Sequence, residues 1–493
     1  MSDLLIGIDV GTSSCKVAVF DADGIAMAQE SRDYPVHYPK PGWAEQNPDD
    51  WWYAICTAVQ DLLKKSEINP KRIAGVGIAG QSWSAIPIDK HGNCLCPTPI
   101  WMDTRSADIC MELSGKIGAD NIFRISGNPL EPTYTLPKIL WYKRELPEVY
   151  ANAVKILSSN GYIAFRLTGE TSQDICQAYG YANFNMERGN WDEALGREIG
   201  LRRDLLCELM PCHEIIGSVT KDAALRCGLA EGTPVVAGGL DAACGTLGAG
   251  VLHNGQTQEQ GGQAGGMSIC TDSYHAEPSL ILSRHVVPDR WLLQGGTVGG
   301  GGVIKWLGGE LWPDKSFSEL SLRAEKAAPG SDGLVFLPYM AGERSPIWDA
   351  HAKGIYYGLD YSKKDSHIIR ASMEGVAFSL RHNIEVASAA GAEVGRLSAM
   401  GGASNSLIWT QIKSDITGKP IDVPSSDTAT TLGAAMLAGV AAGVFRDFDD
   451  AVSRTVKTTR SHEPNMSNKN VYDKNYKIYL ELYERLKSLM QED

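Results

Sequence analysis

The hydrophobic and polar positions near the start of the chain predict a β-hairpin. Residues 4–10 are almost entirely apolar, which is typical of a buried strand. Val17, Val19 and Phe20 begin a second apolar run. The small residues Gly11-Thr12-Ser13-Ser14 between the two runs form the predicted turn, and such a turn offers backbone N–H groups and hydroxyls to a phosphate.

The same pattern predicts alternating strands and helices further along. Asn47-Pro48 is a helix start signal, and the helix is expected to continue to Lys65. Residues 73–79 are predicted to form another strand, and residues 86–89 and 98–102 are expected to add further strands to the same sheet. The remaining predicted strands cover residues 154–157, 235–240 and 397–400, and the remaining predicted helices cover 242–250, 406–417 and 472–490.

Two stretches of small residues suggest how the chain is divided. Residues 257–271 contain a second glycine-rich turn between extended segments, which faintly repeats the first hairpin. The alanine- and glycine-rich run 431–445 is too short to span a bilayer and suits a closely packed core helix. We expect two domains, residues 1–245 and residues 246–493.

Composition narrows the class of protein. The 493 residues are 43% hydrophobic and 21% charged, with a net charge of -13, so the surface should repel nucleic acid and anionic membrane. Neither is an expected partner. The 11 cysteines are an odd number, and acidic Asp3 and the immediate strand pattern argue against a signal peptide, so we expect reduced thiols and a cytoplasmic location. The sequence leaves the oligomeric state open, and a homodimer is one of the states that it allows.

Two aspartates that end apolar strands are the candidates for chemistry. Asp9 precedes the first turn and is expected to hold Mg²⁺, with Lys16 supplying positive charge nearby. Asp241 follows a strand and is expected to take a proton from a substrate hydroxyl. The positive end of the following helix is expected to keep Asp241 ionised. The alternative for Asp241 is a helix cap without a catalytic role.

Four glycine-rich turns suggest a nucleotide site, since backbone amides can surround phosphates. They lie at Gly11, at residues 261–266, at residues 295–302 and at Gly401-Gly402. The alternative is that a large α/β protein with 52 glycines forms such turns without a ligand.

The ordered motifs of the chain resemble those of the FGGY carbohydrate kinases, within them the xylulokinase-like branch, over nearly the whole length. The resemblance includes the pair Trp51-Trp52 and residues 401–415. Its other motifs are GIDVGTS at 7–13, GWAEQ at 42–46, GIAGQ at 77–81, WMDTR at 101–105, PKILW at 137–141, GGLDAA at 238–243 and LPYMAGERSP at 337–346.

This resemblance implies an α/β fold of two actin-like (RNase-H-like) ATPase domains around a central cleft, and transfer of the ATP γ-phosphate to a sugar or polyol with Mg²⁺. The N-terminal domain would carry the sugar, the base and the first phosphate loop. The implied catalytic base is Asp241, and the implied sugar-binding residues are Gln81, Ser82, Trp83, Asp103 and Arg105. The implied nucleotide-binding residues are Gly11, Thr12, Ser13, Lys16, Gly262, Gln263, Gly301, Lys305, Gly402, Ala403 and Ser406.

Three departures from the family pattern bear on the substrate. Ser82-Trp83 stands where xylulokinases usually have Met-His, Gly262-Gln263-Ala264 replaces the usual Gly-Thr-Ser, and Ser159-Asn160-Gly161 replaces Pro-Lys-Asp. A ketopentose such as xylulose, or a related sugar, is the expected acceptor. Two alternatives remain: a kinase-derived sugar-binding protein with weak catalysis, and an actin- or chaperone-like ATPase that no sugar stimulates.

Overall fold

The computed structural model describes residues 3–425 and 428–491, and these fold into two compact α/β units. The first unit contains residues 3–252 together with 282–291 and 428–456, and the second contains residues 253–281, 292–425 and 457–491. The predicted single boundary after residue 245 differs from this division, because the segment 428–456 returns to the first unit.

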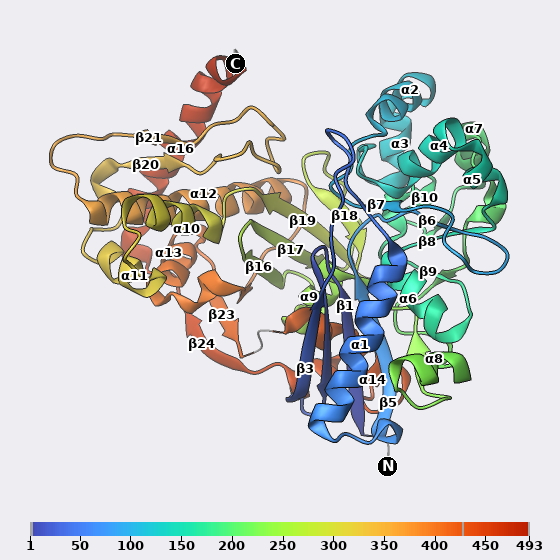
Figure 1. Cartoon of the computed structure of the whole chain (residues 1–493). Helices are drawn as coiled ribbons and strands as arrows, with labels where there is room; N and C mark the ends of the chain where they lie inside the picture. Colours follow the sequence, from blue (N-terminus) through green and yellow to red (C-terminus); the bar gives the residue numbers. More distant parts are fainter. Residues whose placement is uncertain (1–2, 426–427, 492–493) are drawn as a thin grey trace. The chain divides into compact units, whose positions relative to one another are not determined.

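The first unit is organised by one mixed sheet (Figure 1). Its strand order is β13-β14-β5-β1-β2-β3, and β15 also pairs with β5. The strands are β1 (Leu4–Val10), β2 (Ser14–Phe20), β3 (Ala26–Asp33), β5 (Ile73–Gly80), β13 (Ile215–Ser218), β14 (Pro234–Val236) and β15 (Gly239–Leu240). The predicted hairpin is confirmed: β1 and β2 are antiparallel, with Asp9 opposite Lys16.

Helices pack on both faces of this sheet, against apolar side chains on one face and against glycines on the other. Even-numbered residues of β1, from Leu4 to Val10, belong to the core that α1 (Pro48–Ser66) completes with Trp51, Ile55 and Val59. On the other face, Gly7 and Gly77 lie opposite each other in β1 and β5. A Cβ on either glycine would lie 1.8 Å from a carbonyl oxygen of α14 (Ala429–Ala441). Glycine therefore allows α14 to touch the sheet, and the predicted core helix is confirmed.

Other predicted elements form but pair differently. Neither β6 (Ile86–Ile88) nor β7 (Thr98–Pro99) continues the main sheet, because β6 pairs with β8 (Lys155–Leu157) and β7 pairs with β4 (Glu45–Gln46). The strand predicted over 235–240 is interrupted at Gly238, whose φ of 72° turns the chain between β14 and β15. The expectation of one continuous sheet was therefore wrong.

The rest of the first unit consists mainly of short helices and strands. They are α2 (Ala107–Ile117), α3 (Ala119–Ser126), α4 (Thr135–Glu145), α5 (Pro147–Asn152), α6 (Ser159–Thr168), β9 (Gln173–Asp174), β10 (Phe184–Asn185), β11 (Asn190–Trp191), α7 (Glu193–Ile199), β12 (Leu209–Met210), α8 (Lys221–Cys227), α9 (Asp241–Gly248) and α15 (Phe448–Thr455).

The second unit contains a sheet in which β19, β17, β16, β22, β23 and β24 follow in this order. Its strands are β16 (Thr257–Gly261), β17 (Gly265–Thr271), β19 (Trp291–Thr297), β20 (Val335–Leu337), β21 (Ile355–Tyr357), β22 (Leu397–Met400), β23 (Ile421–Pro424) and β24 (Thr458–His462), with β20 and β21 forming a separate pair. Its helices are α10 (Gly301–Leu311), α11 (Phe317–Ala324), α12 (Asp365–Ala389), α13 (Leu407–Thr417) and α16 (Lys469–Met490).

The core of the second unit confirms the interpretation of the last helix. Tyr472, Tyr476 and Tyr479 of α16 are buried and pack with Phe378 of α12, so this aromatic stripe is a packing surface. Among the residues that the structure describes, no helix is both long and apolar enough to cross a membrane. All 11 cysteines are free thiols, as expected.

Candidate active site

Asp9 and Asp241 occupy the ends of two elements of the first unit. Asp9 is the sixth residue of β1 and is 9% exposed, and its Oδ1 has no hydrogen-bond partner among the described residues. Burial raises the pKa of Asp9 to about 6, against the opposing effect of Lys16. A buried carboxylate oxygen without a partner is costly, and a hard cation such as Mg²⁺ would satisfy it. Asp9 therefore fits the predicted metal-binding role.

Asp241 is half-buried and begins α9, where its Oδ1 accepts a hydrogen bond of 2.6 Å from the amide of Ala242. Loss of solvent and, after it, the negative charge of Asp9 raise the pKa of Asp241 to about 7. The helix end was expected to keep Asp241 ionised at neutral pH; instead, desolvation and the charge of Asp9 outweigh the hydrogen bond from the Ala242 amide, which lowers the pKa. A base whose pKa lies near the working pH is better suited to accept a proton.

The turn after β5 carries three predicted sugar-binding residues. Gln81 is 1% exposed; its Nε2 donates to Gln46 Oε1 at 2.8 Å, and its own Oε1 lacks a partner among the described residues. Trp83 is half-buried and its indole N–H also lacks one. Ser82, between them, is half-buried. Two unpartnered polar groups in one turn are what a polyhydroxylated ligand would satisfy.

An aromatic cluster surrounds Trp83. Its ring lies 4.7 Å from the ring of Tyr134 and 5.5 Å from that of Tyr179, measured between centroids. The sequence analysis missed both tyrosines, because they follow Trp83 by about 50 and 100 residues and stand in no recognised motif. Their only signal is aromatic character, which core packing explains equally well.

Asp103 and Arg105 are placed differently from the expectation. Asp103 is fully buried and accepts hydrogen bonds from the amide of Ala44 at 2.6 Å and from Arg105 Nη2 at 2.7 Å. Arg105 also pairs with Glu45 at 2.8 Å and lies over the ring of Trp43 at 3.7 Å. Because these groups already satisfy one another, Asp103 offers no surface to a sugar, and Arg105 is held between Asp103, Glu45 and the ring of Trp43.

Lys138 is a second buried cation near this turn. It is completely buried, and its Nζ donates to the carbonyl oxygens of Trp83 at 2.9 Å and Ile100 at 2.8 Å. Burial lowers its pKa to about 7. The amine therefore fixes the backbone of Trp83 rather than remaining free for an anionic ligand.

The tip of the first hairpin is only partly available for phosphate. Thr12 Oγ1 accepts a hydrogen bond from Trp101 Nε1 at 2.9 Å, and the amide of Gly11 donates to the carbonyl of Ser14 at 3.1 Å. Ser13 and Lys16 are exposed. The hydroxyl of Ser13 and the amine of Lys16 are therefore the groups of this predicted loop that lie open to a ligand.

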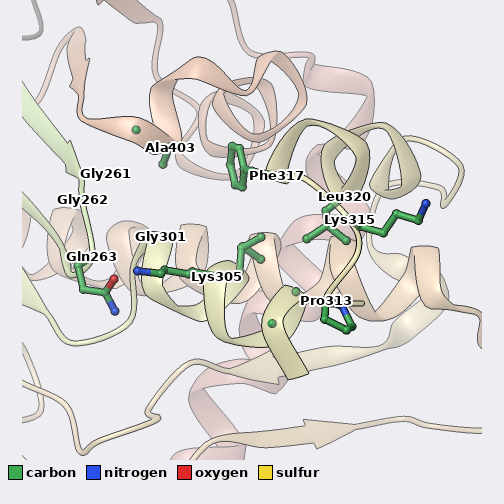
Figure 2. A pocket seen from close by; sticks show the side chains of 14 residues that line it. Gly261, Gly262, Gln263, Gly301, Lys305, Pro313, Lys315, Phe317, Leu320 and Ala403 are labelled. Atoms are coloured by element: carbon green, nitrogen blue, oxygen red, sulfur yellow. The ribbon is translucent and has the colours of Figure 1, made fainter. Parts of the chain in front are cut away.

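Separately, the second unit contains a cavity of about 530 Å³ (Figure 2). Its walls include six of the seven nucleotide-binding residues predicted in this half: Gly262, Gln263, Gly301, Lys305, Gly402 and Ala403. Ile304, Phe317 and Leu320 supply apolar surface, and Figure 2 shows the Lys305 side chain extending toward Gln263. An apolar wall with a few polar groups is typical of a small-molecule site.

Close backbone contacts explain the glycines around this cavity. The amides of Gly301 and Gly302, at the start of α10, donate to the carbonyls of Gly262 at 2.7 Å and Gln263 at 2.9 Å. A Cβ on Gly300 would lie 2.4 Å from the carbonyl carbon of Ala264. The glycines therefore let two loops touch. The seventh predicted residue, Ser406, lies outside the cavity lining, because its side chain caps α13.

Two buried acids that the sequence analysis missed support these loops. Glu259 pairs with Lys413 at 2.6 Å, and both side chains are nearly inaccessible. Glu343 accepts hydrogen bonds from the amides of Val298 at 2.6 Å and Arg344 at 2.8 Å, which fixes the glycine-dense segment before α10. Glu343 belongs to the motif at 337–346, whose role the sequence does not reveal.

Comparison with known proteins identifies the family. The N-terminal domain of the FGGY family of carbohydrate kinases matches residues 4–248, and its C-terminal domain matches residues 269–442. The xylulose kinase of Bacillus subtilis is 30% identical over 491 residues, covering 98% of this chain and 97% of that protein. The chain belongs to the FGGY family of carbohydrate kinases. It is therefore a sugar phosphotransferase that uses ATP.

Two further relatives show how widely this FGGY kinase is matched. The gluconokinase of Bacillus subtilis is 30% identical over 476 residues, covering 94% of this chain and 92% of that protein. The ligand-bound crystal structure of xylulose kinase from Lactobacillus acidophilus is 28% identical and superimposes with a TM-score of 0.91, covering 98% of each chain. These structural matches confirm the predicted fold of two actin-like α/β domains.

Proposed function

We propose that this FGGY kinase phosphorylates a neutral ketopentose, with xylulose as the first candidate, in an ATP- and Mg²⁺-dependent reaction. The observation that carries the proposal is that three of the buried polar atoms without a partner among the described residues belong to predicted site residues: Asp9 Oδ1, Gln81 Oε1 and the indole N–H of Trp83. One needs a cation, and the other two need hydroxyl groups.

The relatives include both xylulose kinases and gluconokinases. The acceptors in these names differ in charge, since xylulose is neutral. Gluconate carries a carboxylate, which a binding site normally meets with a cation. Two buried cations of this unit are already used: Lys138, which contacts the turn at the carbonyl of Trp83, by two carbonyl groups, and Arg105 by Asp103 and Glu45. This arrangement favours an uncharged sugar.

In the proposed mechanism, Gln81 and Trp83 bind and orient the sugar, and Asp241 Oδ2 accepts the proton of its attacking hydroxyl. Asp9 would hold Mg²⁺, which neutralises charge on the phosphates when it is bound. The cavity beside Gly262, Lys305 and Ala403 would hold ATP, with Gln263, which stands in place of the usual threonine, donating through its amide.

The test is a coupled assay of ADP release over ketoses, aldoses, polyols and aldonates, with and without EDTA. We expect xylulose or a related ketopentose to give the highest kcat/KM, gluconate to be at least tenfold poorer, and EDTA to abolish the signal. A preference for gluconate would contradict the neutral-acceptor assignment. ATP turnover that no compound stimulates would favour the ATPase alternative, and binding without turnover would favour a sugar-binding protein.

A further inference from the structure

A buried polar side chain, Gln177, holds both ends of the turn that carries Gln81, Ser82 and Trp83. Gln177 is 2% exposed and follows β9. Its Nε2 donates to the carbonyl of Gly80 at 3.3 Å, and its Oε1 accepts from the amide of Trp83 at 3.3 Å. One side chain therefore fixes the residue before the turn and the residue that ends it.

The orientation of this amide follows from its partners. Nε2 also donates to Asn160 Oδ1 at 2.8 Å, so it faces two oxygen acceptors, whereas Oε1 faces an N–H donor. A flipped amide would place like groups against each other at all three contacts. Gln177 therefore binds both ends of the turn with a single orientation of its side-chain amide.

The network continues from Gln177 toward Asp241. Asn160 Nδ2 donates to Asp174 Oδ2 at 3.0 Å and to the carbonyl of Ala237 at 3.1 Å. Cys176 donates to Asp174 Oδ1 at 3.0 Å, and its sulfur accepts from the amide of Leu240, also at 3.0 Å. Leu240 directly precedes Asp241, so the network connects the turn with the segment that places the base.

Asp174 serves this network as an acceptor. Its two oxygens accept from Cys176, from the amide of Gln177 and from the side-chain amides of Asn160 and Gln173. Asp174, Cys176 and Cys212 have ligand-type atoms within 4.8 Å of one another. Because four protein donors already occupy the carboxylate, the group is fitted to hold backbone rather than a metal ion.

The turn needs such support because of its backbone conformation. Trp83 has a φ of 57°, in the left-handed region that bulky residues rarely adopt. Such a conformation persists only where surrounding contacts determine it. Here the amide of Trp83 is held by Gln177 and its carbonyl by Lys138.

We propose that Gln177 is a positioning residue for the acceptor sugar. It touches no substrate itself, but it fixes the conformation of the turn and the position of that turn relative to Asp241. The inference rests on the proposed function, because the sugar-binding role of Gln81 and Trp83 is part of that proposal.

The test compares Gln177→Met with Gln173→Met. Gln173 is equally buried at 2% and also donates to Asp174, at 3.0 Å to its carbonyl and 3.4 Å to Oδ2. Methionine keeps the length of either side chain and removes its amide. Each hydrogen bond lost between Gln177 and the turn corresponds to about a factor of five. We therefore expect Gln177→Met to raise the KM for the sugar about tenfold to thirtyfold and to lower kcat, with the KM for ATP unchanged.

The control separates positioning from general stability. Gln173→Met should lower the melting temperature with little change in the KM for the sugar. An equal rise in this KM in both variants, or an unchanged KM in Gln177→Met, would overturn the inference. If Gln177→Met does not fold, Gln177→Asn keeps an amide that is one methylene shorter, and it should raise the same KM by a smaller factor; an unchanged KM there would also overturn it.

A parallel Trp83→Ala variant distinguishes this inference from the proposed function. If Trp83→Ala raises the KM for the sugar and Gln177→Met does not, only the positioning role fails. If neither variant changes this KM, the assignment of the turn to sugar binding fails, and the positioning role fails with it.

Discussion

The proposed acceptor region of the first unit and the cavity of the second unit are built in different ways. Around Gln81 and Trp83, geometry is set by polar side chains such as Gln177, Asn160 and Lys138, each with named partners. Around the cavity, geometry is set by loops that touch through glycine, as at Gly300 and Gly301. A substitution in the first region therefore acts through a lost side-chain contact, whereas a substitution at a glycine of the second region acts by displacing backbone.

Buried acids of this chain are held in two ways. Asp103, Glu259 and Glu374 pair with the cations Arg105, Lys413 and Arg370. Asp174 and Glu343 accept from uncharged donors, and Asp9 has one unpartnered oxygen. An unpartnered oxygen on a buried acid is costly for stability, so Asp9 is the acid of the first unit that most clearly points to a functional demand.

The largest expected effect comes from Asp241→Asn. Asparagine keeps the shape of the side chain and can still accept from the amide of Ala242, but it cannot take a proton. A general base typically contributes about a hundredfold to ten-thousandfold, so we expect kcat to fall by that factor. The KM for ATP and the melting temperature should change little.

A matched control for this variant is Asp192→Asn. Asp192 caps α7 by accepting from the amide of Leu195, and it lies outside the proposed site. This variant should keep the wild-type kcat. Nearly wild-type turnover in folded Asp241→Asn would instead assign Asp241 the capping role that its position also allows.

Only some parts of the fold and the candidate site could be predicted from the sequence. The hairpin of residues 4–20, the glycine loops and Asp241 could be predicted, because local pattern and ordered motifs encode them. Gln177, Tyr134 and Tyr179 could not, since their roles depend on contacts with residues about 50 to 100 positions away. The sheet positions of β6 and β7 were mispredicted for the same reason: strand pairing is not local.

Gly300→Ala should give the next largest effect, on the nucleotide side. The added Cβ would lie 2.4 Å from the carbonyl carbon of Ala264 and 2.5 Å from the amide nitrogen of Gly265, so the backbone must shift. Overpacking of this kind costs about 1–3 kcal/mol. We expect the KM for ATP to rise about fivefold to a hundredfold and the KM for the sugar to stay unchanged.

Gly309→Ala is the control on the same helix. Gly309 lines the cavity, but a Cβ there would meet no atom within 4 Å. Because this methyl group displaces no backbone, the KM for ATP should change much less than in Gly300→Ala. If Gly300→Ala binds ATP normally, backbone contact is not what shapes the site, and the contrast between the two regions is lost.

Trp83→Ala tests the acceptor side with a smaller effect. Removing the indole takes away the unpartnered N–H that the proposed sugar would satisfy, a hydrogen bond worth up to about 1.5 kcal/mol, and two aromatic contacts within the protein, each worth about 0.5–1.5 kcal/mol. We expect the KM for the sugar to rise about tenfold, with a modest fall in melting temperature. Trp191→Ala, which removes a core ring packed on Tyr181 and Phe184, should show the reverse pattern. A Trp83→Ala variant that only loses stability would make Trp83 a core residue.

The smallest effect on activity is expected for His285→Gln, which tests how the first unit buries ionisable groups. His285 is 1% exposed and its Nε2–H donates to the carbonyl of Val251 at 3.0 Å. Burial lowers its pKa to about 4, and the charge of Arg290 acts in the same direction. The folded protein therefore binds this proton less readily than the unfolded chain, whose histidine pKa is about 6.5.

The sign of the pH dependence follows from this difference. Above about pH 6.5 the histidine is neutral in both states and its contribution to stability is complete. As the pH falls from about 6.5 to 4, the unfolded chain takes up the proton first, and the free energy of unfolding should decrease by up to about 3 kcal/mol. Glutamine can still donate to Val251 but does not titrate, so denaturant unfolding of His285→Gln should have a shallower pH dependence in this range. Parallel curves for the two proteins would show that His285 is protonated as easily in the folded state, and that burial does not hold it neutral.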